Sequence, residues 1–177
     1  MIGVGTAIAD RPQLTVRGWH SDEVNQPLRV ILDTKGQLPV DGPLFDGNSP
    51  TLIITSELTS TKTIHGWKSQ NVEIATLPLK DNRINLTSVL EYLGKRGVLQ
   101  VLVEGGAKLF NSLLEENLID QLTIYVGPRI LGGTGLPLFP NAPAPNIEAC
   151  PHLNLLKVVR FDDTVRLDYA NEVRANR

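Results

Sequence analysis

The sequence contains little from which a covalent or metal-centred site could be built. It has one cysteine, Cys150, and 3 histidines in 177 residues. A single cysteine excludes an internal disulfide and a cysteine-cluster zinc site, and such usage is typical of a reduced, intracellular protein. His20, His65 and His152 lack the spacing of metal ligands. We therefore expect no metal and a cytoplasmic location.

Charge of one sign and long apolar runs are also scarce. The 17 basic and 19 acidic residues give a net charge of −2, without the clustered basic excess of a protein that binds nucleic acid. No run approaches the roughly 18 apolar residues of a membrane span, and the opening MIGVGTAIADRPQ lacks the pattern of a signal peptide. With 41% apolar residues, the chain can form one compact domain over residues 1–177.

Several short apolar segments have the pattern of buried strands. The opening IGVG (2–5) is typical of a strand end that reaches a glycine turn. The runs LRVILDT (28–34), TLIITS (51–56) and VEIATLP (72–78) predict three further strands. Between the opening segment IGVG and the run LRVILDT, residues 6–27 are rich in turn and breaker residues and predict a loop.

The second half of the sequence adds helices and a hairpin. INLTSVLEYLGKRGV (84–98) predicts a helix that stops at Gly97. LQVLVEG (99–105), then AKLFNSLLEENLI (107–119), then a second apolar run predict strand, helix and strand as a βαβ unit. Near the C-terminus, two strands joined at Asp162-Asp163 predict an antiparallel hairpin. The predicted fold is α/β, with a mixed, mostly parallel sheet flanked by helices.

Glu104, Gly105 and Gly106 stand where a predicted strand passes into a helix. A helix start offers unpaired N–H groups and partial positive charge, and glycine lets a phosphate approach the backbone. The two glycines are also compatible with close packing at a strand-to-helix turn, without any ligand. Glu104 either faces a ligand at the strand end or caps the helix.

A second group of candidate residues follows the opening strand. Arg17 could bind a phosphate through its planar fork, and Asp10 could accept from a hydroxyl or orient the arginine. A surface ion pair between the two is the alternative. Thr34 ends a strand as Glu104 does, and either reaches the same crevice or caps a turn. No G-x-S-x-G pattern is present, so we do not expect a covalent hydrolase.

Three blocks of the sequence resemble a known family. GVGTAIADRPQLTVR, QPLRVILDT and VLVEGGAKLFNSLLEENLIDQLTIYVGPRILGG are similar, in order and spacing, to the C-terminal reductase domain of the bifunctional riboflavin-biosynthesis deaminase/reductase. This resemblance implies a dihydrofolate-reductase-like fold and the cofactor NADPH. It also implies reduction of the ribosyl group of 5-amino-6-(5-phosphoribosylamino)uracil to ribityl, by hydride delivery to C1′ of the sugar.

The resemblance further implies roles for individual residues. Thr6 and Asp10 would lie at the loop shared by cofactor and substrate, and Thr34 would contact NADPH. Leu14 and Arg17 would contact the substrate with Glu104, and Glu104 and Asp10 would be the catalytic residues. The residues around the cofactor phosphates would be Gly105, Gly106, Ala107, Lys108, Leu109, Phe110, Asn111 and Ser112.

Two departures from the family pattern shape the remaining expectations. The zinc ligands of the deaminase half are absent, so we expect no deaminase activity and a separate deaminase partner. The family domain starts earlier, with another strand, so we expect an N-terminally incomplete domain. We also expect a homodimer and a small phosphorylated substrate. Two alternatives stay open: a non-catalytic nucleotide-binding or assembly remnant, and a dihydrofolate-reductase-like pteridine reductase.

Overall fold

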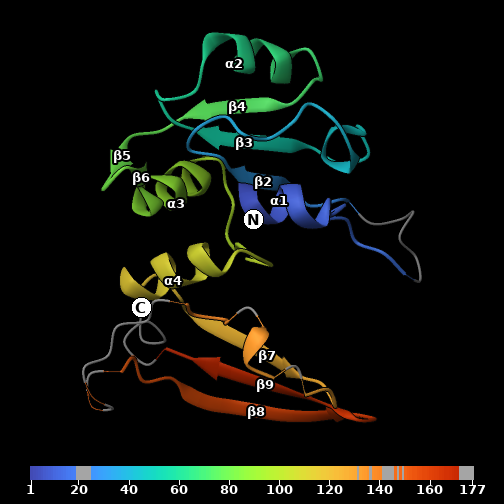
Figure 1. Ribbon diagram of the computed structural model, residues 1–177, viewed down its shortest axis with the longest axis vertical. Coiled ribbons are helices and arrows are strands. Elements are labelled where there is room, and N and C mark those ends of the chain that lie inside the picture. Colours follow the sequence, from blue (N-terminus) through green and yellow to red (C-terminus); the bar gives the residue numbers. More distant parts are fainter. Residues whose placement is uncertain are drawn as a thin grey trace. The chain divides into compact units, whose positions relative to one another are not determined.

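The computed structural model describes residues 1–18, 25–130, 132–135, 137–140, 146, 148 and 150–171. Part of the segment predicted as a loop, and His20 with it, lies outside these residues. The chain divides into two compact units, Met1–Leu109 and Phe110–Arg177 (Figure 1). Within the described ranges, no helix is long and apolar enough to cross a membrane.

The first unit is built on a parallel sheet with the strand order β1-β2-β3-β4. These strands are β1 (Ile2–Gly3), β2 (Arg29–Leu32), β3 (Thr51–Thr55) and β4 (Glu73–Thr76). Every residue of β2 and β3 is buried, as expected for parallel strands covered on both faces. The opening strand end and the three apolar runs are therefore confirmed as strands.

One apolar core joins this sheet to α1 (Val4–Asp10) and α2 (Thr61–Lys68). Its buried members are Ile2, Ala7, Ile31, Leu38, Leu44, Ile53 and Trp67. The sequence pattern predicts no element at α2, but two features define the helix. Ser60 caps it by accepting from Thr63 N (3.1 Å), and Trp67 is fully buried with its Nε1 donating to Leu38 O (3.0 Å).

The prediction of a loop over residues 6–27 is wrong for its first part, because α1 extends to Asp10. Ala7 is buried, and such burial holds a helix too short to be stable alone. The helix ends where Arg11 adopts a left-handed backbone (φ 44°), just ahead of Pro12, which cannot continue a helix. Thr6 and Asp10 therefore lie on a helix.

The first unit is completed by shorter elements. The predicted helix over 84–98 is confirmed as α3 (Leu86–Lys95), and Gly97 follows it with a positive φ of 80°. The remaining elements are the 3-10 helix η2 (Pro43–Phe45) and the antiparallel pair β5 (Leu79–Lys80) and β6 (Arg83–Ile84).

The strand predicted over residues 99–105 is not formed. Leu99 is fully exposed, and only Gly105 makes a parallel bridge, to Ile2. Two hydrogen bonds extend this contact, from Met1 N to Leu102 O (2.6 Å) and from Glu104 N to Met1 O (3.2 Å). The physical reason is that β1 is two residues long, so the neighbouring segment finds too short a ladder to become a strand.

The second unit contains a three-stranded antiparallel sheet in the order β7-β9-β8. The strands are β7 (Gln121–Val126), β8 (Asn154–Phe161) and β9 (Thr164–Ala170). The turn at Asp162-Asp163 is confirmed, with Asp162 at a positive φ of 48°. The predicted βαβ unit is wrong, because β7 pairs antiparallel with β9. The 3-10 helix η3 (Gly132–Thr134) follows β7.

The helix predicted over 107–119 forms as α4 (Ala107–Glu115). It ends early because Asn117 takes a left-handed φ of 52°. Asn117 N then bonds Leu114 O (3.0 Å), and Leu118 N bonds Leu113 O (2.8 Å). This pair of bonds is a Schellman motif, which satisfies the last carbonyls of a helix. The α/β fold class, with a parallel sheet and a C-terminal antiparallel hairpin, is confirmed, and the strands are divided among separate sheets.

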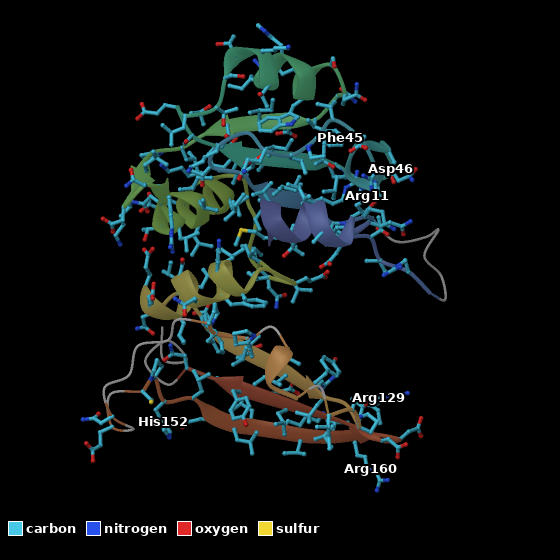
Figure 2. The ribbon with its side chains drawn as sticks, in the orientation of Figure 1. Arg11, Phe45, Asp46, Arg129, His152 and Arg160 are labelled. Carbon is cyan, nitrogen blue, oxygen red and sulfur yellow. The ribbon has the colours of Figure 1, made fainter. Side chains whose placement is uncertain are left out.

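Arg29 is the most heavily bonded buried side chain at the start of β2. It is 2% exposed. Its guanidinium donates to Thr51 Oγ1 (2.9 Å), Gln13 O (3.3 Å), Pro43 O (2.8 Å), Asp46 Oδ1 (3.1 Å) and Ser49 O (2.7 Å). Asp46 lies with Phe45 and Arg11 at one end of the first unit (Figure 2). One cation therefore ties two loops to two strands.

We expect Arg29→Met to lower the free energy of unfolding by about 3–5 kcal/mol, because several buried acceptors and one carboxylate lose their hydrogen-bond donor. Urea denaturation measures the loss. Arg96→Met is the matched control: Arg96 pairs with Glu73 at 2.6 Å, but the two side chains are 30% and 56% exposed. That control should cost only about 0–1 kcal/mol.

The difference in unfolding free energy between wild type and Arg29→Met should depend on pH. Burial acts to raise the pKa of Asp46, but hydrogen bonds from the Asn48 backbone and from Arg29 outweigh it and hold this pKa below its usual value. A carboxyl whose pKa is lower in the folded than in the unfolded state stabilises the folded protein at pH values above the unfolded pKa. This stabilisation is lost as the pH falls through the folded pKa. The gap between wild type and Arg29→Met should therefore narrow below about pH 4. A gap independent of pH would contradict the role of Asp46.

Candidate active site

The candidate site lies at β1, the edge strand of the parallel sheet, where a later segment returns and makes one isolated parallel bridge. Ile2 pairs with Ile31 of β2 on one side and with Gly105 on the other. The chain thus runs outward from β1 to β4 and returns to the opposite side of β1. In open α/β sheets, ligands bind at such a switch point, beyond the carboxyl ends of the strands.

Thr6 and the two glycines form the floor of this site. A Cβ on Gly105 would lie 2.7 Å from Thr6 Cγ2, so no larger residue fits there. Gly106 has a φ of 103°, a conformation that favours glycine. A side chain on it would come 3.5 Å from Thr6 Oγ1 and 3.7 Å from Gly3 N. Close packing against Thr6 explains Gly105, and a turn into α4 explains Gly106. We call Thr6, Gly105 and Gly106 the glycine cradle.

Two helices begin at the glycine cradle without acidic residues in their first turns. α1 starts after Gly3, which makes no side-chain capping bond, and α4 starts at Ala107. The first N–H groups of a helix have no partner within it and carry partial positive charge. This arrangement favours an anion, and glycine backbone allows its close approach.

Glu104 stands directly before the glycine cradle. Its backbone N–H donates to Met1 O (3.2 Å). Its side chain is exposed and makes no hydrogen bond within the described part of the chain. A carboxylate that capped α4 would bond the N–H groups of the first turn. Glu104 is therefore placed as an accessible acid beside the cradle.

Asp10, Leu14 and Arg17 are distributed along α1 and the segment that follows it. Asp10, the last residue of α1, and Arg17 are both exposed, and no ion pair joins them among the described residues. The aspartate that pairs with an arginine here is Asp41, 3.3 Å from Arg11. Leu14 has a φ of 51° and packs against the apolar core. The predicted substrate contacts of these residues stay predictions.

Thr34 belongs to a polar cluster at the carboxyl ends of β2 and β3 that the sequence analysis largely missed. Asp33 is fully buried, and its Oδ2 accepts from Leu38 N (2.7 Å). Thr55 Oγ1 donates to Asp33 O (2.6 Å), and Ser56 Oγ donates to Thr34 O (2.7 Å). A hydroxyl residue at the end of each of two adjacent apolar runs was the available signal. Thr34 is half-buried at this edge, and its contact with NADPH stays a prediction.

The other predicted cofactor residues lie on α4. Ala107, Lys108 and Leu109 form its first turn, with Lys108 exposed and Leu109 buried. Phe110, Asn111 and Ser112 follow and belong to the second unit. Asn111 is 3% exposed, and its Nδ2 donates to Glu115 Oε1 (2.7 Å). Phe110 and Ser112 are half-buried. Contact of all six with cofactor phosphates stays a prediction.

These features define a class: an α/β protein with a candidate ligand site at the carboxyl edge of a parallel sheet, beside a helix that follows two glycines. Comparison with known families places the chain within that class. It belongs to the RibD C-terminal domain family, whose sequence profile matches residues 1–167.

Individual relatives agree with this assignment. The riboflavin biosynthesis protein RibD of Chlamydia pneumoniae is 39% identical over 139 residues, covering 78% of this chain and 37% of that protein. The 2,5-diamino-6-ribosylamino-4(3H)-pyrimidinone 5′-phosphate reductase of Archaeoglobus fulgidus is 31% identical, covering 100% of this chain and 79% of that protein. The chain spans less than half the length of the RibD proteins it matches.

Solved structures show the same fold. Acinetobacter baumannii RibD superposes with a TM-score of 0.80 at 29% identity, covering 96% of this chain and 45% of that one. The riboflavin biosynthesis reductase Rib7 of Saccharomyces cerevisiae superposes with a TM-score of 0.70 at 26% identity, covering 96% of this chain and 73% of that one.

We expect Gly105→Ala to destabilise the protein by about 1–3 kcal/mol, because its Cβ collides with Thr6. Adding Thr6→Ala removes the colliding atoms, so the double variant should recover most of the loss. Urea denaturation of the four proteins in this cycle measures the coupling.

Gly94→Ala is the control for the glycine substitution itself. Nothing lies within 4 Å of a Cβ at Gly94, which is in α3. This variant should gain up to about 1 kcal/mol from helix propensity. A Gly105→Ala loss that Thr6→Ala leaves unchanged would contradict the contact.

Proposed function

We propose that this chain is an NADPH-dependent reductase of riboflavin biosynthesis, which reduces the ribosyl group of 5-amino-6-(5-phosphoribosylamino)uracil to ribityl. The observation that carries the proposal is the glycine cradle at the strand switch point, with the accessible acid Glu104 beside it. Membership of the RibD C-terminal domain family supports a cofactor phosphate as the anion at this candidate site.

The residues at the cradle fit the pyrophosphate of a dinucleotide. Gly106, which is only partly buried, turns the chain into α4 with no side chain in the way, and the N–H groups of Ala107 to Leu109 open α4 without a competing acid. Thr6 adds a hydroxyl at the same point. We infer that these groups hold the phosphates and that Thr34 contacts the cofactor from the turn after β2. NADPH bound there would supply the hydride for C1′ of the sugar.

The remaining residues act on the substrate. Arg17 binds the substrate phosphate through the paired donors of its planar guanidinium, and Leu14 contacts the substrate. Glu104 and Asp10 accept hydrogen bonds from the sugar hydroxyls. Hydride addition to C1′ of the ring-opened imine moves the electron pair of the C1′=N bond to the nitrogen, which takes a proton from water oriented by these two carboxylates. The chain thus positions and polarises the substrate and leaves the redox chemistry to the cofactor.

Two substrates must be compared. The name of the Archaeoglobus relative specifies a 2,5-diamino pyrimidinone phosphate, and that protein aligns with all of this chain. A matching Thermotoga maritima structure is described as a deaminase and 5-amino-6-(5-phosphoribosylamino)uracil reductase. The two compounds differ in whether the ring has been deaminated. A chain that reduces the diamino compound would act before deamination.

Steady-state oxidation of NADPH tests the proposal directly, with each pyrimidine phosphate and with dihydrofolate as separate substrates. We expect turnover with the uracil compound and none with dihydrofolate, and replacement of NADPH by NADH measures cofactor preference. Faster turnover of the diamino compound would reassign the substrate. Binding of NADPH without turnover of any compound would instead support a non-catalytic remnant, and no binding would reject the proposal.

We expect Glu104→Gln to reduce turnover roughly hundredfold, in the range of lost acid–base assistance. Its free energy of unfolding should change by less than about 0.5 kcal/mol, because an exposed side chain contributes little to the core. Glu91→Gln, at an exposed position on α3, is the matched control and should leave both quantities unchanged. Equal losses of stability and activity in Glu104→Gln would point to a capping role.

We expect Gly106→Val to weaken NADPH binding by about tenfold or more, because a β-branched side chain blocks approach to the N–H groups of α4. Fluorescence titration of NADPH measures the affinity. Gly127→Val is the control, since nothing lies within 4 Å of a Cβ at Gly127. Denaturation curves separate the backbone strain at Gly106 from the loss of binding. Unchanged affinity in a folded Gly106→Val protein would remove the cradle from the site.

A further inference from the structure

Two residues that carry side chains take a left-handed backbone conformation just after α1. Arg11 has a φ of 44° and Leu14 a φ of 51°. Glycine and asparagine adopt this conformation easily, whereas most other residues do so at a cost in free energy. Such residues persist where the surrounding structure holds them, and they are frequent at ligand sites. The turn 11–14 lies between Asp10 and Arg17, to which the proposed function assigns contacts with the substrate.

Leu14 is held from the inside of this turn. It packs against the apolar core. The buried guanidinium of Arg29 donates both to Gln13 O (3.3 Å) and to Pro43 O (2.8 Å), so the inner side of the turn is joined to the loop 41–46. These buried contacts account for the conformation of Leu14.

Arg11 is held from the outside of the turn. Its Nη1 and Nη2 atoms both donate to Asp41 Oδ2, at 3.3 Å and 3.4 Å. Its guanidinium also lies against the backbone of Gly42, where a Cβ would come 2.7 Å from Nη2 and 3.2 Å from Cζ. Gly42 has a φ of 90°, which favours glycine, and the missing side chain leaves room for the guanidinium. The outer side of the turn is thus joined to the same loop.

The Arg11–Asp41 ion pair spans a small cleft between α1 and this loop. The cleft is lined mainly by apolar side chains of α1 and of residues 38–44, and Arg11 and Asp41 are its polar members. Figure 2 shows Arg11 at this end of the first unit. The side chains of Arg11 and Asp41 are 54% and 58% exposed, and exposed pairs contribute little to stability. A role in folding therefore does not explain the arrangement.

We propose that Arg11 is a positioning residue for the substrate. Its contacts with Asp41 and Gly42 set the direction in which the chain leaves α1, and this direction determines where Arg17 lies relative to Asp10. The proposal rests on the proposed function, in which Arg17 binds the substrate phosphate and Asp10 the sugar. A small displacement of groups that hold a substrate weakens binding and slows the reaction. Arg11 acts through Arg17, since its own guanidinium is engaged by the loop.

Steady-state kinetics of Arg11→Asn tests this role. Asparagine accepts the left-handed conformation better than arginine does, so the variant should fold as stably as the wild type. We expect the KM for the pyrimidine phosphate to rise about five- to tenfold, while kcat and the dissociation constant of NADPH change less than about twofold. Arg96→Asn is the matched control, because Arg96 forms another exposed ion pair, with Glu73; its loss should alter none of these quantities.

Asp41→Asn separates positioning from direct binding. If Arg11 positions the turn, loss of its partner should raise the KM as Arg11→Asn does, and the double variant should be no worse than either single variant. If Arg11 bound the phosphate itself, its release from Asp41 would lower the KM. A lower KM in Asp41→Asn, or an unchanged KM in a folded Arg11→Asn protein, would overturn the proposal.

A binding measurement without turnover distinguishes this proposal from the proposed function. Ribose 5-phosphate carries the sugar and the phosphate of the substrate, and calorimetry measures its affinity. We expect Arg11→Asn and Asp41→Asn each to weaken its binding about fivefold. If the wild type binds ribose 5-phosphate without oxidising NADPH, the proposed reductase fails, and weaker binding by both variants still supports the role of Arg11. If the wild type turns over the pyrimidine phosphate and both variants bind ribose 5-phosphate normally, only the role of Arg11 is rejected.

Discussion

The candidate site depends on the pairing of one buried residue, Ile2, with neighbours on both sides. Through Ile31 it joins the parallel sheet, and through Gly105 it brings the end of a distant segment to the start of α1. This parallel contact places Thr6 against two glycines about a hundred positions away in the sequence. The hydrogen bonds between Met1 and residues 102 and 104 hold the same junction. A short ladder is therefore the frame on which the glycine cradle rests.

A helix start without acidic residues has unmet hydrogen-bonding capacity when empty. Backbone donors at the beginning of α4 are satisfied by water or by an anionic ligand. Binding of a pyrophosphate would thus complete the helix, and the ligand would stabilise the native state by mass action. The Glu104 backbone donates a hydrogen bond at the junction, while its exposed carboxylate attracts the Met1 ammonium without a hydrogen bond among the described residues. The carboxylate therefore keeps its hydrogen-bonding capacity for a ligand.

Local sequence patterns predicted the elements that are uniformly apolar or that are stabilised by contacts close in sequence. Strands β2 and β3 were recognisable because buried parallel strands leave continuous apolar runs. The glycines and Glu104 were found because they are adjacent in sequence. α1 was missed because one buried alanine holds it. Residues 99–105 were misassigned because an apolar run becomes a strand only with a partner of matching length. The Asp33 and Arg29 networks arise from register between distant segments, which spacing along the chain does not reveal.

The bond from Arg29 to the carbonyl of Gln13 has a mechanical consequence. It fixes a pivot just before Leu14, whose left-handed φ of 51° redirects the chain toward Arg17. Residues before the pivot share the rigidity of β2 and β3, because the same guanidinium also bonds Thr51. Beyond it, Leu14 packs against the apolar core, and Val16 exchanges two hydrogen bonds with the Gln26 side chain. The backbone that leads to Arg17 is therefore fastened at both ends to the base of the sheet, and the exposed arginine extends from a supported segment.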